Sequence, residues 1–448
     1  MIGQPRGTAA TAPSDGSAAV DPLDRVEGIR YLTRVMRGGL EAFMDGWDPA
    51  WPVLRSLPYN VKLGADNPDN LYMYGTVSGA YEYRLYGKRN TVTYFSIGCY
   101  CGSRPGQGSS KPSHLDSSRL VTKPDGSFEV FLTPTPRGDN WLPLPPDASR
   151  IVVRQTFLDR TAEAPADVAI ERLPLAGAVR VAGEQQAGGA GLAEGKAAAG
   201  SAGATGAASV PLVDAEGRES KPALTAGQVV AGLAGASVFI AGSIHQFQAW
   251  SRQFASRPNT LFTLDHDAYM SAWADPAIHF FHGYWRLGPG QALLIQVTPP
   301  DCPYWNFQLD NWWMESLDYV AHPATTTNKA TAARMPDGSV CLVVAHADPT
   351  RPPAKASAAA TGALQPSPNG KAAAAGTAEG SAAPVSLVGL LTEPLLKGVT
   401  WIDTAHHSHG TMGWRWVLAT SHPVPRCRVL ALGAPLAEAI REGVAAAP

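Results

Sequence analysis

Residues Tyr72–Cys101 read YMYGTVSGAYEYRLYGKRNTVTYFSIGCYC, and this stretch decides the fold class. Aromatic and β-branched residues dominate its two runs, Tyr72–Tyr86 and Thr91–Cys101, as is typical of β-strands. The intervening segment Gly87–Asn90 has the composition of a hairpin turn. The stretch therefore predicts neighbouring antiparallel strands.

Strands of similar composition are expected along the rest of the chain. They are Ser127–Leu132, Ile151–Leu158, His279–Leu287, Ala292–Thr298 and Val340–His346. Few helical patterns lie between these runs, which favours antiparallel β-sandwiches over an α/β sheet. The fold class is therefore expected to be mainly β.

An amphipathic helix is predicted between Asp21 and Asp45, near the start of the chain. Apolar residues recur there at spacings of three and four, and Pro22 suits a first helical turn. The apolar positions are Ile29, Leu32, Val35, Met36, Leu40 and Phe43.

A second, longer helix is predicted over Thr225–Phe254, with Thr225 as its N-cap. Its centre, Val229–Ile244, carries no charged residue over 16 positions and contains three glycines. A bilayer span needs roughly 20 apolar residues. We therefore expect a buried helix that connects two β-rich parts, and we do not favour a membrane span.

A series of short motifs occurs twice in the same order. The pairs are Tyr83–Gly87 with Tyr284–Gly288, Pro124–Ser127 with Pro336–Ser339, Asn140–Leu142 with Thr400–Ile402, and Val153–Gln155 with Trp414–Trp416. Pro-Asp-Gly is a common turn, so a single match carries little weight. Four matches in one order favour a duplication. We therefore predict two related antiparallel β-sandwich halves joined by the long helix.

Composition sets the expected boundaries of these parts. Gly183–Ser209 and Ala354–Ala383 consist almost entirely of Ala, Gly and a few polar residues, and they bury too little apolar surface to offset the entropy of ordering. We predict that both are flexible insertions. The full division is a disordered tail at 1–20, the first half at 21–175, a linker at 183–222, the connecting helix at 223–275, the second half at 276–432 with its insertion at 350–393, and a C-terminal helix or tail at 433–448.

Charge and cysteine content limit the partners and the compartment. The net charge is −2 and the basic residues are scattered, so a nucleic-acid partner is not expected. Five cysteines, mostly in apolar runs, indicate buried thiols in a reducing compartment. The first 20 residues lack the apolar core of a secretory signal, which predicts a cytoplasmic protein. An organellar transit peptide is the alternative, because this start is Arg-containing and acid-poor.

One segment of the second half resembles a known family. Tyr304–Ser316, YWNFQLDNWWMES, is similar to the signature of domain of unknown function 1214 (DUF 1214), and the match extends over roughly Tyr284–Leu430. Further similar segments are Ala345–Pro349, Trp401–Thr404 and Gly410–Trp416, with Asp66–Gly98 and Arg154–Arg160 resembling the N-terminal region of longer members. The resemblance implies jelly-roll-like sandwich domains and no established activity.

The chain departs from that family pattern in one loop. Members run almost directly from Asp-Pro-Gly into Asn-Trp-Leu-Asp, whereas here about 50 residues follow Pro349 and Thr400 replaces the Asn. His406 stands where the pattern has Gly. An insertion at this position removes or gates any site that the loop lines.

The densest cluster of aromatic and amide side chains lies within Tyr304–Ser316. In a strand, alternate residues from Trp305 to Leu309 share one face, and those from Asn306 to Asp310 share the other. Aromatic faces flanked by amides suit a sugar or another flat polyhydroxylated ligand, and tryptophans packed in a core are the alternative. The predicted ligand-binding residues are Trp305, Asn306, Asn311, Trp312 and Arg415.

Carboxylates and imidazoles of the second half offer two kinds of chemistry. Glu315, Asp403 and His407 form a candidate general acid/base set, as a hydrolase or lyase requires. His407 and His409 point the same way in a strand and are candidate metal ligands, with a polar loop as the alternative. The sequence contains no His-Glu-x-x-His spacing, phosphate-binding Gly-rich loop or Gly-x-Ser-x-Gly elbow.

Arg154 and Arg415 occupy equivalent positions of the repeated motifs, in apolar strands. A buried arginine needs a partner, and Asp139 and Asp403 are the expected carboxylates. The oxygen-rich segment Asp66–Asn70 predicts an Asx-turn rather than a calcium loop, because it lacks the ligand spacing of an EF-hand.

Three functions are compatible with these patterns. The leading hypothesis is a small-molecule or carbohydrate-binding β-sandwich protein with its site in the second half. The alternatives are a hydrolase or lyase that acts on a polyhydroxylated substrate, and a structural or assembly module. The sequence identifies no cofactor and leaves oligomerisation open.

Overall fold

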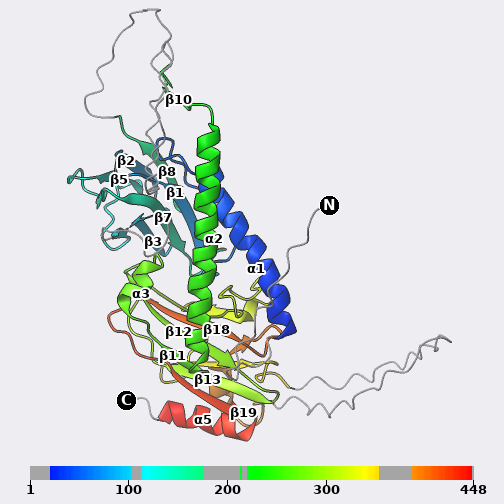
Figure 1. Ribbon diagram of the computed structural model, residues 1–448. Coiled ribbons are helices and arrows are strands. Elements are labelled where there is room, and N and C mark those ends of the chain that lie inside the picture. The colour runs from blue at the N-terminus through cyan, green and yellow to red at the C-terminus, as the bar shows by residue number, and fades with distance from the viewer. Residues whose placement is uncertain (1–20, 103–111, 175–211, 214–218, 353–385, 446–448) are drawn as a thin grey trace, which may run out of the picture.

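Two β-sandwiches lie one beyond the other with a long helix beside both, as Figure 1 shows for this computed structural model. The structure describes residues 21–102, 112–174, 212–213, 219–352 and 386–445. The predicted tail at 1–20 and the two segments predicted to be flexible insertions lie outside these residues. The described part of the chain is mainly β, which confirms the predicted fold class.

The first sandwich packs two four-stranded sheets face to face. Its strands are β1 (Asn70–Thr76), β2 (Tyr83–Lys88), β3 (Tyr94–Cys101), β4 (Ser113–Asp116), β5 (Ser127–Thr133), β6 (Trp141–Pro143), β7 (Ala148–Thr156) and β8 (Asp167–Arg172). The sheet orders are β1-β7-β3-β4 and β6-β5-β2-β8. Inward-facing residues such as Leu85, Val130 and Val153 meet in one buried core.

The second sandwich has the same construction with one additional edge strand. Its strands are β11 (Thr260–Phe262), β12 (Ile278–Arg286), β13 (Gln291–Val297), β14 (Tyr304–Leu309), β15 (Thr326–Asn328), β16 (Val340–Ala345), β17 (Val399–Asp403), β18 (His409–Val417) and β19 (Arg426–Ala431). The sheet orders are β11-β12-β18-β14-β15 and β17-β16-β13-β19. Trp305 and Trp414 stack in its core with ring centroids 5.0 Å apart.

The strand order of the first sandwich recurs in the second, which confirms the predicted duplication. Strands β1 to β8 correspond one by one to β12 to β19, because the sheet orders match position by position. Each sandwich also contains a parallel pair, β5 with β6 and β16 with β17. Trp141 lies opposite Phe131 in the first pair, and Trp401 lies opposite Val343 in the second.

Three of the four repeated motifs fall on equivalent strands, and one does not. The Pro-Asp-Gly turns lead into β5 and β16, the tryptophan motifs lie in β6 and β17, and the arginine motifs lie in β7 and β18. The pairing of Tyr83–Gly87 with Tyr284–Gly288 is wrong, because the first belongs to β2 and the second ends β12, the counterpart of β1. Aromatic and apolar residues are common in strands, so this motif matched by composition alone.

The predicted hairpin at Gly87–Asn90 is also wrong. β2 pairs with β5 and β8, whereas β3 pairs with β4 and β7, so the chain crosses from one sheet to the other between them. Asn90 has a positive φ of 48°, as turn residues often do, which explains why the local sequence resembles a hairpin. The run Tyr72–Tyr86 is likewise divided between β1 and β2.

Helices α1 (Pro22–Leu40) and α2 (Ala226–Ala255) form where the sequence predicts them, and they lie side by side (Figure 1). Thr225 caps α2 in a reciprocal capping box with Gln228. The remaining elements are a π-helical turn at Glu41–Asp45, a 3-10 turn at Pro323–Thr325, the short helices α3 (His266–Ser271) and α4 (Glu393–Lys397), helix α5 (Ala434–Ala445), and the two-stranded ladder β9 (Leu212–Val213) with β10 (Glu219–Ser220).

Helix α2 is not the buried helix that its composition predicts. Only 17% of its most apolar 18-residue window is covered by the rest of the structure, and the helix is long and apolar enough to cross a membrane by length and composition. Its buried positions include Gly232, Ala236 and Ser243. These small residues allow close approach, since a Cβ at Gly232 would lie 2.7 Å from the Phe43 carbonyl oxygen. Other bulky apolar residues of α2, among them Val230 and Leu233, remain exposed.

Candidate functional site

Strands β7 and β18, at equivalent places in the two sandwiches, each turn an arginine away from the core at equivalent positions, Arg154 and Arg415. Val153 of β7 points into the first core, so its neighbour Arg154 points outward. Trp414 and Trp416 of β18 point into the second core, so Arg415 between them points outward. Both arginines are nevertheless buried, because the two sandwiches cover these sheet faces for each other.

Arg154 and Arg415 line one cavity of about 470 Å³ between the sandwiches, which we call the inter-sandwich cavity. Its walls come from β1 and β7 of the first sandwich, β12 and β18 of the second, and one face of α2. Aromatic side chains on these walls include Tyr72, Tyr74, Phe247, Trp250, Tyr269 and Phe280. A volume of this size and an aromatic lining are typical of small-molecule sites.

Neutral groups hold the Arg415 guanidinium in place. Its Nη1 donates to Gln308 Oε1 at 2.6 Å and to Asn306 Oδ1 at 3.3 Å, and its Nη2 donates to the Ala65 carbonyl oxygen. Asn306 therefore orients the arginine rather than facing a ligand alone. Among the described residues, no carboxylate forms an ion pair with Arg415.

The Arg154 guanidinium is bonded in the same manner. Its Nη1 donates to the Tyr100 hydroxyl at 2.9 Å, and its Nη2 donates to the Trp273 carbonyl oxygen. The carboxylates expected from the sequence are wrong for both arginines: Asp139 is exposed, and Asp403 pairs with His322. Within the described part of the chain, Arg154 also makes no direct ion pair.

A further buried arginine, Arg150, lies two residues before Val152 on the same outward face of β7. Burial lowers its pKa to about 10, and its guanidinium sits over the ring of Phe43, with centroid 5.3 Å away. It lines a smaller cavity of about 60 Å³, which shares Tyr74 and Trp273 with the inter-sandwich cavity. The space between sandwiches and helices is therefore rich in cationic and aromatic groups.

Asp275 brings a carboxylate to the cavity wall, but this charge is already engaged. His114 Nε2 lies 2.8 Å from its Oδ1, and the hydroxyls of Ser96 and Tyr94 donate to its Oδ2 at 2.6 and 3.0 Å. Burial alone raises the pKa of this carboxyl, yet the hydrogen bond and charge of His114 and the charge of Arg154 hold it well below its usual range. Asp275 thus stays ionised and joined to the first sandwich.

Two titratable groups near Arg415 have strongly shifted pKa values. Burial, and then the charge of Arg415, lower the pKa of His282 on the cavity wall to about 3, so the imidazole is neutral at pH 7. Burial raises the pKa of Asp310 to about 7 despite the Gln308 hydrogen bond and Arg415. Neither residue therefore supplies a full counter-charge to the arginine.

The tryptophans predicted to bind a ligand are packing residues. Trp305 is fully buried against Trp414, as the core alternative predicts, and the predicted alternation of faces along β14 is confirmed. Trp312 packs edge-on against Tyr284, with ring centroids 5.8 Å apart. Asn311 uses its side-chain oxygen to accept from the backbone N–H groups of Trp313 and Glu315, which closes the turn after β14.

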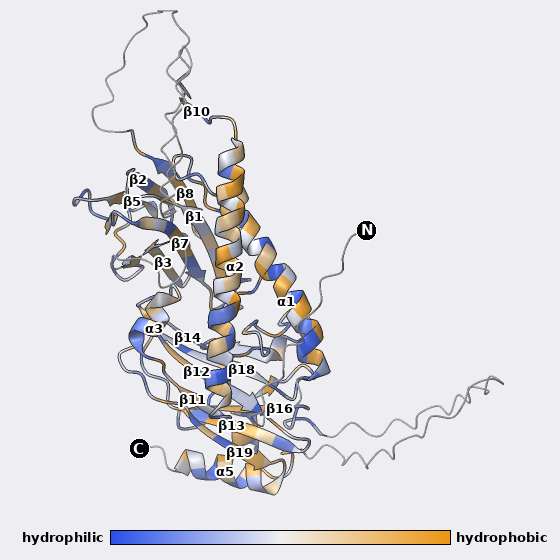
Figure 2. Cartoon of the chain, in the orientation of Figure 1, coloured by the Kyte–Doolittle hydropathy of each residue, from blue (hydrophilic) through white to orange (hydrophobic). Residues whose placement is uncertain are grey.

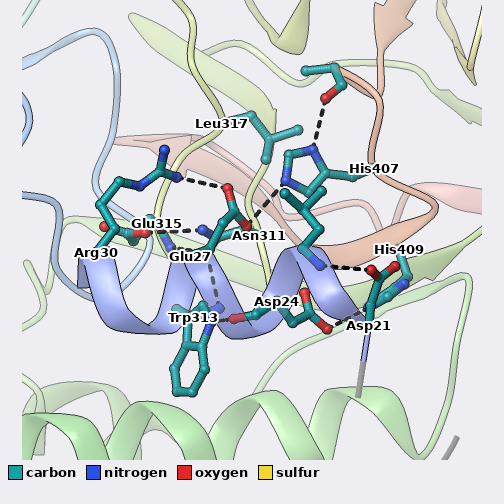
Figure 3. Close-up of polar contacts among 12 residues, drawn as sticks. Asp21, Asp24, Glu27, Arg30, Asn311, Trp313, Glu315, Leu317, His407 and His409 are labelled. Carbon is teal, nitrogen blue, oxygen red and sulfur yellow. Dashed lines mark hydrogen bonds and ion pairs between the residues drawn. The ribbon is translucent and has the colours of Figure 1, made fainter. Parts of the chain in front are cut away.

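Two of the three predicted catalytic residues, Glu315 and His407, lie on the same side of helix α1, as Figure 3 shows. Glu315 is 1% exposed and accepts from Arg34 Nη1 at 2.7 Å, and burial raises its pKa although Arg34 opposes this. His407 Nε2 lies 3.2 Å from Glu27 Oε2; burial lowers the pKa of the imidazole, but Glu27 and two backbone carbonyls outweigh it and raise the pKa. Residues of α1 therefore occupy the positions where a substrate would meet these groups.

The predicted metal ligands point to different partners. His409 Nε2 lies 2.9 Å from Asp24 Oδ2, whereas His407 contacts Glu27 (Figure 3). The described residues contain no cluster of three or more His, Cys, Asp or Glu side chains that would hold a metal ion. The two imidazoles instead connect α1 to the start of β18 and to the loop before it.

The third predicted catalytic residue, Asp403, is separate from the other two. Its Oδ2 lies 3.0 Å from His322 Nδ1, and its Oδ1 accepts from the Ala405 N–H at 2.9 Å. Both side chains of this ion pair are partly exposed. It is therefore a loop contact rather than part of a common site with Glu315.

We expect Asp403→Asn to change the free energy of unfolding by less than about 1 kcal/mol, because partly exposed ion pairs contribute little. Urea denaturation at pH 7 measures this value. A loss of several kcal/mol would show that Asp403 compensates a buried charge after all, which the geometry around Arg415 contradicts.

The predicted Asx-turn at Asp66–Asn70 is confirmed and has a role that the sequence did not reveal. The Asp69 N–H donates to Asn67 Oδ1 at 3.0 Å, which forms the turn. The Asn67 amide then donates to the Tyr304 hydroxyl at 3.0 Å, and Ser316 donates to Asp66. This loop of the first half thus reaches the outward face of the second half beside Arg415.

The sequence missed the inter-sandwich cavity because its residues come from distant segments. Tyr72, Trp250 and His282 carry no shared motif, yet they line one space. The available signal was the equivalence of Arg154 and Arg415. A buried arginine at the equivalent position of each copy indicates that the same outer sheet face of both sandwiches is covered in the folded protein.

Comparisons with solved structures identify a relative of this chain. No model of a known family and no curated protein matches the chain. The crystal structure of a putative uncharacterized protein from Burkholderia cenocepacia is 33% identical, with a TM-score of 0.69 over 93% of this chain and 92% of that chain. A structure of the VPA0106 protein from Vibrio parahaemolyticus is 9% identical over 90% of this chain and 97% of that chain. Its TM-score of 0.39 is too low to show a shared fold. The resemblance to DUF 1214 stays a prediction.

Proposed function

We propose that this chain, which belongs to the same family as the uncharacterised Burkholderia cenocepacia protein, binds a small organic anion in the inter-sandwich cavity. That relative carries no stated function, so the proposal rests on the geometry of this chain. The observation that carries it is the placement of Arg154 and Arg415. Both are buried, both line one cavity, and both are bonded by neutral groups.

Electrostatics favours an anion as the occupant. Taking a guanidinium out of water costs several kcal/mol, and hydrogen bonds to amides and carbonyls offset only part of this cost. A carboxylate or phosphate supplies the opposite charge together with paired acceptor oxygens, which suit the planar guanidinium. Asp275 is a carboxylate on the cavity wall whose charge acts on Arg154. It does not form an ion pair with Arg154, because its Oδ1 already lies 2.8 Å from His114 Nε2.

The cavity walls define the rest of the ligand. Aromatic rings such as Tyr72, Trp250 and Phe280 offer apolar surface beside the charges. A volume of about 470 Å³ suits a ligand of metabolite size. An aryl or alkyl carboxylate meets both requirements, and so does a sugar acid that stacks a ring face on an aromatic wall. A neutral sugar brings no negative charge to either guanidinium.

The test uses a panel of aryl and straight-chain monocarboxylates, each beside its neutral primary amide, with isothermal titration calorimetry as the readout. At least one carboxylate is expected to bind at least tenfold more tightly than its amide. Arg415→Met and Arg154→Met are each expected to weaken that binding by about thirtyfold or more, since losing one partner of a buried charge pair costs about 2 kcal/mol or more.

Two controls keep this test independent of folding. Arg84→Met removes an arginine that pairs with Glu129 and Glu171 on the outer sheet of the first sandwich, and it is expected to leave ligand affinity unchanged. Arg415→Lys keeps the charge and is expected to recover part of the affinity. Equal binding of carboxylates and amides, or equal effects of Arg84→Met and Arg415→Met, would contradict the proposal. A panel without any binder would favour a structural module.

A further inference from the structure

Helix α1 turns most of its apolar side toward solvent and its acidic residues Asp24 and Glu27 toward the protein. The inward side carries Asp24, Glu27, Tyr31 and Val35, all buried. The apolar positions that the sequence predicts as one face are mostly exposed, and Ile29 is 69% exposed. A surface helix of a water-soluble protein normally has the opposite orientation.

Specific contacts fix this orientation of α1. On its inward side Asp24 pairs with His409 and Glu27 pairs with His407 (Figure 3). Arg34 pairs with Glu315 on the same side. The Trp313 indole N–H also donates to the Asp24 carbonyl oxygen at 2.8 Å. Rotating α1 to bury its apolar side would break all of these contacts. The exposed apolar side is therefore part of the folded arrangement.

Helix α2 extends the apolar surface beside α1. Its exposed side carries Val230, Leu233 and Val238, and no Asp, Glu, Lys or Arg occurs from Ala226 to Ser251. Figure 2 shows hydrophobic residues along both helices, which stand in front of the sheets in this view. We call this surface the helical face; it consists of Val26, Ile29, Leu32, Met36, Leu40, Val230, Leu233 and Val238.

Charges around the helical face are arranged by sign. By helical periodicity Arg30 and Arg37 border one side of the α1 apolar row, and Arg25 lies within the row at its N-terminal end; all three are exposed. The acidic residues Asp24 and Glu27 are turned inward and buried. An apolar stripe with arginines at its margins is the pattern of helices that lie in the interface of anionic membranes.

We propose that the helical face docks onto an anionic lipid membrane, with α1 and α2 lying in the plane of the headgroups. This inference does not depend on the ligand proposed for the cavity. A membrane span is not favoured, because the opposite side of α2 contacts the sheets and lines the inter-sandwich cavity through Phe239, Ser243 and Trp250. A two-fold contact between copies through the helical face is also less favourable, because it would place the exposed arginines of both copies close together, where they repel each other.

Vesicle sedimentation of the full chain tests the proposal, with phosphatidylcholine vesicles that contain or lack phosphatidylglycerol. The protein is expected to partition onto the anionic vesicles and to dissociate as salt is added. Ile29→Gln combined with Met36→Gln is expected to lower partitioning about tenfold or more, because each change removes apolar side-chain burial. Arg25→Gln combined with Arg37→Gln is expected to lower it about thirtyfold at low salt.

The matched control is Val121→Gln combined with Val424→Gln, two exposed valines outside the helical face, which is expected to leave partitioning unchanged. Circular dichroism and a melting curve establish that each variant is folded. Wild-type protein that ignores anionic vesicles, or binds them equally after the Ile29 and Met36 changes, overturns the proposal. A wild-type dimer in light scattering that becomes monomeric in this variant without vesicle binding would make the helical face an interface between copies instead.

Discussion

Replacing Asp275 by Asn is expected to destabilise the protein by about 3–5 kcal/mol, because it removes one partner of a buried charge network. The carboxylate is fully buried. Its Oδ1 contacts His114 of β4, and its Oδ2 accepts hydrogen bonds from the hydroxyls of Ser96 and Tyr94 of β3. An Asn side chain places an N–H₂ group where the carboxylate accepts hydrogen bonds. It also leaves the buried charge of Arg154 without the opposing charge of Asp275.

The effect of Asp275→Asn has a defined pH dependence. The folded-state pKa of Asp275 is depressed below the unfolded value of about 3.9, so its contribution is fully present above that value. The contribution is lost as the pH falls through the folded-state pKa. The difference in unfolding free energy between wild type and variant is therefore expected to be large near pH 7 and to narrow below about pH 4.

Urea denaturation followed by tryptophan fluorescence and by circular dichroism measures this difference. The control is Asp139→Asn, a change of an exposed aspartate that is expected to stay within about 0.5 kcal/mol of wild type. If the two variants were equally stable, the Asp275 network would not hold the sandwiches together. If the difference in unfolding free energy between wild type and Asp275→Asn stayed constant down to acid pH, the variant would have lost packing rather than a charge.

Local patterns predicted the individual strands and the two long helices well. The Pro-Asp-Gly turns and the arginine motifs also identified the duplication, because those residues have fixed places in each sandwich. The connection at Gly87–Asn90 was mispredicted for a physical reason. Turn residues determine that the chain reverses, but long-range pairing determines whether the next strand joins the same sheet or the opposite one.

The candidate site was less predictable than the fold. Trp305 and Asn306 are adjacent in sequence, but strand alternation sends one into the core and the other to Arg415. The burial of Glu315 and His407 depends on α1, whose contacting residues lie 281 and 380 residues away from them in sequence. Periodicity revealed that α1 is amphipathic. It did not reveal which side faces the protein, because that depends on charged partners located elsewhere in the chain.

Arg34→Met is expected to destabilise the protein by about 2–4 kcal/mol, because it leaves Glu315 buried without its main counter-charge. Arg34 is 19% exposed, so part of the pair energy is screened by water. Lys62, a further nearby cation, donates to the carbonyl oxygens of Ser316 and Leu317 and does not replace the lost contact. Arg37→Met is the matched control on the same helix, since Arg37 is 53% exposed and lies 3.7 Å from Glu41.

The pH dependence of Arg34→Met distinguishes a lost ion pair from lost helix packing. Burial raises the pKa of Glu315 in the wild type, and without Arg34 this pKa is expected to rise further. A carboxyl whose pKa is higher in the folded than in the unfolded protein lowers the free energy of unfolding as the pH rises through these pKa values. The difference in unfolding free energy between wild type and Arg34→Met should therefore grow from about pH 4 upward. Adding Glu315→Gln to Arg34→Met is expected to restore much of the stability at pH 7, because a neutral side chain needs no counter-charge.

Urea denaturation at about pH 4 and at pH 7 measures these stabilities, and limited proteolysis reports whether α1 stays attached. If Arg34→Met behaves like Arg37→Met, the Glu315 pair does not position α1, and the outward orientation of its apolar side loses one of its three ionic anchors.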